Sequence, residues 1–257
     1  LDDDDRQEES DAFVALVEGD AKLLESRFFD EYLTEDEQAL YALVQVFGGE
    51  ADPATEAARE RARSLPAFLR EYLYFPYEAG LEFAEELAED GGFKSVDRAL
   101  CRPPTSTEQV LHPGLYREGQ GWSPPEVPDV AAATGCAGLR RGALGEFKMR
   151  EVLELHVGQS TAAEAAAGWD GDTFQTVRCG TALGLVDRWV ADSQDDAAQL
   201  QRALARWGSG WARSAAATSG RFSGPGGTGR VTLSGTRVDL VVADDAATAD
   251  RLAAALG

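Results

Sequence analysis

Apolar positions in the first hundred residues recur with a helical period. Over residues 10–32, large apolar side chains return every three or four positions, which predicts a helix capped by the serine at its start. Thr34 and Glu37 have the spacing of a capping box, so a second helix is expected to begin there and to end at the glycine pair 48–49. A polar helix over about 52–64 is expected to follow.

The longest clean helical pattern lies in the middle of this half. Residues 65–90 predict a central helix, with a bend at Pro76 because proline removes an internal hydrogen bond. A short helix over 93–100 follows a Gly-Gly stop. After a Pro-Pro break, Ser106 or Thr107 is placed to cap one further turn.

The second half changes from helical period to paired strands, each pair leading into a helix. The segments VDRWVADSQDDAAQLQRALA and VDLVVADDAATADRLAAAL resemble each other, which predicts two strand–strand–helix units. Such units would form a four-stranded antiparallel sheet with helices on one face. Aspartates at the helix starts are interpreted as caps rather than as a calcium site. The expected ranges are strands 174–179, 182–191, 230–234 and 237–243, helices 143–157, 161–167, 194–207 and 245–256, and a loop or frayed helix over 207–220.

These patterns predict an α+β fold with a mainly helical N-terminal half, followed by a small antiparallel sheet with helices built from two ββα units. The predicted domain division is a helical half over 1–118, a connection rich in Pro, Gly and Ala over 119–142, and an α+β half over 143–257.

Charge narrows the range of partners. The net charge is −21, from 45 acidic and 24 basic residues. Such a field excludes a nucleic-acid partner held by phosphate contacts. The chain contains neither Ile nor Asn and only three lysines, which together with the acidic excess indicates a halophilic archaeon, where salt screens the repulsion between carboxylates. An ordinary acidic protein is the alternative.

Cysteine usage and hydropathy bear on the compartment. Cys101, Cys136 and Cys179 lack metal-site spacing, so one disulfide plus a free thiol, or three unpaired thiols, remain open. No transmembrane segment is expected. Because the chain begins with Leu1, we expect a processed or truncated product.

Candidate chemistry is sparse, because only two histidines are present and no H-E-x-x-H, G-x-S-x-G or phosphate-binding loop occurs. His112 lies in a polar turn four residues after Glu108, so the two would share a helical face; a local hydrogen bond is the alternative to function. His156 ends an apolar helix and is interpreted as structural. Glu18, next to a helical glycine, is either a functional group or an ordinary surface residue.

Several segments together carry a family resemblance. ALVEGDA, FPYEAGLEF, GGFKSVDRAL and above all PPTSTEQVLHP resemble a family of haloarchaeal surface proteins and bacterial lipoproteins that are similar to gluzincin-type zinc metallopeptidases. LGEFKMREVL, AAAGWDGDTF and LVDRWVADSQDDA extend the resemblance over most of the chain.

The resemblance implies roles for particular residues. Glu18 would be the third zinc ligand, and His112 and Tyr116, with Glu108, would stabilise an oxyanion or bind substrate. It implies a groove between the first helix and the central helix, with Glu18 pointing into it. The residues expected to line this cleft are Tyr74, Tyr77 and Glu78.

The H-E-x-x-H segment of that family is missing from this sequence. Zinc is therefore expected only with ligands from residues preceding Leu1, and otherwise no cofactor. We expect the C-terminal portion of a cell-surface, metallopeptidase-like protein that is not proteolytic alone. A peptide or cell-surface protein is the expected partner, and the expected location is extracellular or at the cell surface. The alternative is a non-catalytic extracellular binding or structural module of a halophilic archaeon.

Overall fold

The computed structural model describes residues 6–47, 60–61, 63–214 and 220–257. It divides into two compact units. The first, here called the helical unit, spans residues 12–104. The second, the sheet unit, combines residues 1–11 with 105–257. The domain division at residues 118 and 142 stays a prediction, although the short helices between 107 and 118 belong to the same compact unit as the sheet.

The helical unit confirms the expected helices where it is described, but α1 begins at Gln7, so Ser10 lies inside the helix and the expectation that it caps the start is wrong. Thr34 and Glu37 form the capping box: the Thr34 amide donates to Glu37 Oε2 at 2.8 Å, and the Glu37 amide donates to Thr34 Oγ1 at 3.4 Å. Pro76 lies inside the central helix. Most of the expected polar helix over 52–64 lies outside the described residues. The helices are α1 (Gln7–Tyr32, which begins in the sheet unit), α2 (Glu35–Phe47), α4 (Ala67–Gly91) and α5 (Phe93–Cys101).

Two glycines let α1 and α4 meet backbone to backbone. A Cβ atom on Gly80 would lie 2.1 Å from the Ala15 carbonyl oxygen, and one on Gly19 would lie 2.0 Å from the Gly80 oxygen. No side chain fits at this crossing, which explains why a helix interior tolerates glycine here. The contact involves the residue directly after Glu18, and the expected groove between the two helices stays a prediction.

The sheet is larger than the sequence predicted. Among the described residues, six strands form one antiparallel sheet in the order β1-β2-β3-β6-β5-β4. The four expected strands are present, and the expected connection over 119–142 also contains a helix and an edge strand. The strands are β1 (Ala137–Gly142), β2 (Trp169–Cys179), β3 (Ala182–Ala191), β4 (Arg221–Gly224), β5 (Gly227–Ser234) and β6 (Arg237–Ala243).

The two edge strands are irregular or short. β1 shifts its register on β2 between Gly138 and Arg140, and β4 has only 4 residues. The longest pairing in the sheet joins β2 to β3, from Trp169 opposite Ala191 to Cys179 opposite Ala182. That pairing has a register shift between Trp169 and Gly171, whereas the pairing of β3 with β6 in the middle of the sheet runs without one.

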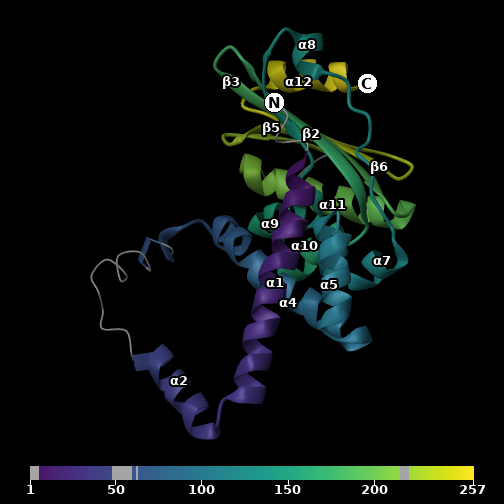
Figure 1. The fold of residues 1–257 in the computed structure, drawn as a ribbon. Helices are drawn as coiled ribbons and strands as arrows, with labels where there is room; N and C mark the ends of the chain where they lie inside the picture. Colours follow the sequence, from purple (N-terminus) through teal and green to yellow (C-terminus); the bar gives the residue numbers. More distant parts are fainter. Residues whose placement is uncertain (1–5, 48–59, 62, 215–219) are drawn as a thin grey trace. The chain divides into compact units, whose positions relative to one another are not determined.

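Helices cover both faces of the sheet (Figure 1). One core gathers Trp169, Trp189 and Leu200 under α9, α10 and α11, and the other gathers Val186 and Leu252 under α8 and α12. The expectation of helices on one face is therefore wrong: side chains alternate between faces along a strand, and each ββα unit turns a different face to its own helix. The helices of this unit are α6 (Thr107–Leu111), α7 (Pro113–Glu118), α8 (Val130–Thr134), α9 (Gly145–Val157), α10 (Gln159–Ala166), α11 (Gln194–Ala212) and α12 (Ala246–Leu256).

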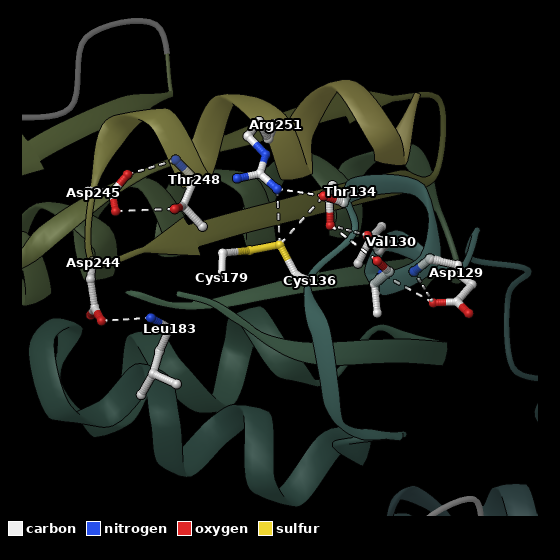
Figure 2. The surroundings of a disulfide bond; sticks show 12 residues. Asp129, Val130, Thr134, Cys136, Cys179, Leu183, Asp244, Asp245, Thr248 and Arg251 are labelled. Carbon is white, nitrogen blue, oxygen red and sulfur yellow. Dashed lines mark hydrogen bonds between the residues drawn. A yellow bond between two sulfur atoms is a disulfide. The ribbon is translucent and has the colours of Figure 1, made fainter. Parts of the chain in front are cut away.

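A disulfide between Cys136 and Cys179 ties the start of β1 to the end of β2 (Figure 2). The Arg251 guanidinium on α12 lies against it, 3.3 Å from the Cys136 sulfur, and donates to the Thr134 carbonyl oxygen. Cys101 is an exposed free thiol. One disulfide plus one free cysteine is thus the alternative that holds. None of the described helices is both long and apolar enough to cross a membrane.

Candidate acid–base site

A buried carboxylate on the sheet fixes the start of α9. Asp172 Oδ2 accepts a hydrogen bond from the Leu144 amide at 2.7 Å, and Oδ1 accepts from the Gly145 amide at 2.9 Å and from the Trp169 indole at 2.8 Å. These amides are among the donors that a helix leaves without internal partners at its N-terminus. Asp172 therefore caps α9 from β2 and holds the next residue, Glu146, in place.

A second buried carboxylate joins α9 to α6. Glu8, on the first turn of α1, accepts from both the amide and the hydroxyl of Thr107 at 2.6 Å. Lys148 Nζ lies 3.4 Å from Glu8 and 2.7 Å from Asp11. Gly145 leaves space for the Glu8 carboxylate, because a Cβ atom there would lie 2.1 Å from Glu8 Oε2. Burial raises the pKa of Glu8 to about 7, although Lys148 and Thr107 favour the charged form.

The helix α6 presents the two residues expected from the sequence. Ser106 caps it, accepting from the Gln109 amide at 3.2 Å, so one of the two predicted caps is confirmed. Glu108 is buried on this helix, and His112 ends it. The His112 Nε2–H donates to Glu146 Oε1 at 2.9 Å, while the imidazole stays half-exposed. A buried carboxylate thus orients a histidine whose other face is open to water.

The protonation states follow from burial and crowding. Burial, reinforced by Glu146 and Asp192, raises the pKa of Glu108 to about 8. The hydrogen bond to Glu146 raises the pKa of His112. Burial also raises the pKa of Glu146, and the His112 cation opposes that rise. Near neutral pH, Glu108 therefore holds a proton, and the charged form of His112 is more favoured than it is in a free imidazole.

Two buried oxygen atoms in this group have no partner. Glu108 Oε1 and Glu146 Oε2 make no hydrogen bond within the described part of the chain. Buried polar atoms are nearly always satisfied, so orphaned oxygens beside a half-exposed histidine are typical of a functional site. Asp170, at the start of β2, and Asp192, after β3, add negative charge, and burial, reinforced by Asp170, raises the pKa of Asp192. We call Glu108, His112, Glu146, Asp170 and Asp192 the acid–base cluster.

The other predicted site residues lie on α7, α1 and α4. Tyr116 is partly buried on α7 in the sheet unit. Glu18 is half-buried on α1 in the helical unit, and Tyr74, Tyr77 and Glu78 are exposed on α4 of that unit. The structure therefore brings Glu108 and His112 together. The roles proposed for the remaining residues stay predictions.

Zinc does not fit the described residues as a complete site. No group of three or more His, Cys, Asp or Glu side chains in the described ranges is arranged to hold a metal ion. Glu108, His112 and Glu146 belong to one cluster, but they are not arranged as ligands around a common point. A zinc role for Glu18 needs ligands from outside these residues, and we derive no chemistry through a metal.

Sequence reasoning missed Glu146 and Asp192. Glu146 lies 34 residues from His112, and no local spacing links the two. The string LGEFKMREVL contains Glu146, but the sequence does not distinguish this glutamate from one that merely begins a helix. The ring of His156, which the sequence predicted to be structural, packs near Trp207 and leaves room only for glycine at position 210.

Residues 136–253 match the family model of a domain of unknown function, DUF8575. The match covers the sheet and includes Glu146, whereas Glu108 and His112 lie before it. No curated protein and no solved structure matches the chain.

Proposed function

We propose that this chain is the C-terminal portion of a cell-surface, zinc-peptidase-like protein, in which the acid–base cluster binds an oxyanion and moves a proton. The observation that carries the proposal is the half-exposed His112 imidazole held at Nε2 by the buried Glu146 carboxylate. Any metal would come from ligands outside the described residues.

The chemistry follows from the two protonation states. A charged imidazole offers its free N–H to an oxygen on which negative charge develops, as at the carbonyl of an acyl group under attack. The neutral Glu108 carboxyl is an acid that can donate a proton near neutral pH, because its pKa is about 8. Glu146 is the positioning residue: it fixes the imidazole and favours its cation.

The surface location rests on different support. Disulfides persist in oxidising compartments, and Cys136–Cys179 ties β1 to β2. The net charge of −21 is typical of proteins that work in concentrated salt. Both features favour the outside of a halophilic cell.

The test is binding of a peptidyl phosphonate, whose anionic tetrahedral oxygens mimic an acyl-transfer intermediate, measured by calorimetry beside the neutral parent peptide. We expect His112→Gln to weaken phosphonate binding by about tenfold or more, since a charge-assisted hydrogen bond is lost, and to change parent-peptide binding little. Glu146→Gln should lower the pH at which phosphonate binding is lost. Glu118→Gln, an exposed acid on α7, is the matched control.

Equal weakening of both ligands, or of none, would contradict the oxyanion role and favour the alternative, a non-catalytic extracellular module. Zinc is tested separately by elemental analysis of the natural protein with any residues that precede Leu1. About one zinc ion per chain, lost in Glu18→Ala, supports the peptidase relationship. Absence of zinc from that protein would favour the module.

A further inference from the structure

A cavity lies in the sheet unit, between the β4–β5 hairpin and α12. Its volume is about 410 Å³. Two arginines, two hydroxyl residues and the small side chains on one face of α12 line it. The lining residues used below are Arg221, Ser223, Thr228, Arg230, Ala249 and Asp250.

The two arginines stand directly opposite each other. Arg221 on β4 pairs with Arg230 on β5, and the next pair on the same face toward the turn is Ser223 with Thr228. Directly paired residues of an antiparallel ladder point to the same face. Arg230 donates to the Ala253 carbonyl oxygen of α12 at 3.0 Å, which shows that this face is the one α12 covers.

The direct pairing of the two arginines is electrostatically unfavourable. Like charges directly opposite on a ladder repel, and a chain with a net charge of −21 has many acids that could separate them. Yet Arg221 makes no ion pair or hydrogen bond with any described residue. Asp250, the acid that lines the cavity, forms no ion pair with either arginine in the described structure.

The hydroxyl groups that line the cavity suit an anionic ligand, as the two arginines do. The exposed Ser223 hydroxyl makes no hydrogen bond within the described ranges. The Thr228 hydroxyl donates to the Phe222 carbonyl oxygen at 3.2 Å and can still accept a hydrogen bond. Ala249 on α12 is small and keeps the cavity open. Two guanidinium forks and a free hydroxyl around one space are the donors that oxyanions prefer.

We propose that this cavity binds the oxyanion group of a small ligand, held between Arg221 and Arg230 and reached by the Ser223 hydroxyl. The bound anion removes the repulsion between the two arginines. The site is separate from the acid–base cluster in residues and in chemistry: it supplies fixed positive charge and hydrogen-bond donors, and it contains neither histidine nor a buried acid.

The experiment is a nuclear magnetic resonance titration of the intact chain with inorganic phosphate, sulfate and acetate, at constant ionic strength set with sodium chloride. We expect saturable shifts at the Ser223 and Thr228 amides. Arg221→Gln should weaken the affinity by about tenfold or more. Within the described residues the Arg221 side chain has no partner to lose, so this variant should fold. Arg202→Gln, an exposed arginine on α11, is the matched control and should bind as the wild type does.

The three titrations distinguish the classes of anion that the site binds. Saturation by phosphate and sulfate but not acetate assigns the site to a phosphoryl or sulfuryl group, and saturation by acetate as well extends it to carboxylates. Shifts that chloride reproduces, that do not saturate, or that persist unchanged in Arg221→Gln would overturn the proposal. Titration of His112→Gln gives the wild-type phosphate affinity if the two sites are distinct, and a lower affinity there would also overturn it.

Discussion

Replacing Glu108 by glutamine should stabilise the sheet unit in a strongly pH-dependent way. The native pKa of about 8 lies above the ordinary value of 4.5. The native state therefore binds the Glu108 proton more tightly than the unfolded state does, and stability falls as pH rises from about 4.5 to about 8. Each unit of pKa difference corresponds to about 1.4 kcal/mol. At pH 7 the cost is thus about 3 kcal/mol at most, and about half of that if water reaches the carboxyl.

Glutamine has the same shape and no charge, so the variant avoids this cost. We expect Glu108→Gln to gain about 1 to 3 kcal/mol at pH 7 and less than about 1 kcal/mol at pH 5. The assay is urea denaturation followed by tryptophan fluorescence, because all five tryptophans lie in the sheet unit: Trp122, Trp169, Trp189, Trp207 and Trp211. Glu118→Gln on the exposed face of α7 controls for net charge. A gain that is the same at both pH values, or a loss at both, would refute a neutral buried carboxyl.

Three other changes test the remaining structure. Gly80→Ala should destabilise the helical unit by about 1 to 3 kcal/mol in thermal melts followed by circular dichroism, because its Cβ would meet the Ala15 carbonyl oxygen, whereas Gly114→Ala, which has open space, should not. Cys136→Ser should lower stability toward urea by about 4 kcal/mol, as expected for a disulfide that closes a loop of 43 residues. A loss that reductant does not reproduce in the wild type would contradict this. Glu146→Gln should lower the His112 pKa in proton titrations, and an unchanged value would exclude Glu146 as its cause.

Local signals predicted local structure well. The Thr34–Glu37 capping box and the Ser106 cap are confirmed because each depends on residues within one helical turn. Asp245 caps α12 as expected, accepting from the Thr248 amide at 2.8 Å. At the matching start of α11 the cap is Ser193 rather than an aspartate. An error in the identity of a cap residue moves the predicted start of a helix by about one residue and leaves the predicted fold unchanged.

Features that depend on distant residues were not predictable. β1 reads AGLRRG, without alternation of apolar and polar residues, and it becomes a strand only because β2 pairs with it and a disulfide holds it. Both the Glu146–His112 contact and the caps from Asp172 and Glu8 join segments that only the folded sheet unit brings together. The sequence placed Glu108 and His112 on one face of a turn, but the partner that gives His112 its chemistry had no local signature.

The irregular edges of the sheet affect how readily the protein pairs with other chains at high protein concentration. An unpaired edge strand is a template on which another chain can add its own strand, and long flat edges lead to aggregation. Here β1 has a shifted register and carries Arg140 and Arg141, while β4 offers only 4 residues to a neighbour. Lengthening β4 or replacing the β1 arginines with valine would restore a usable edge. The natural chain instead combines a broad sheet with two edges that resist intermolecular pairing.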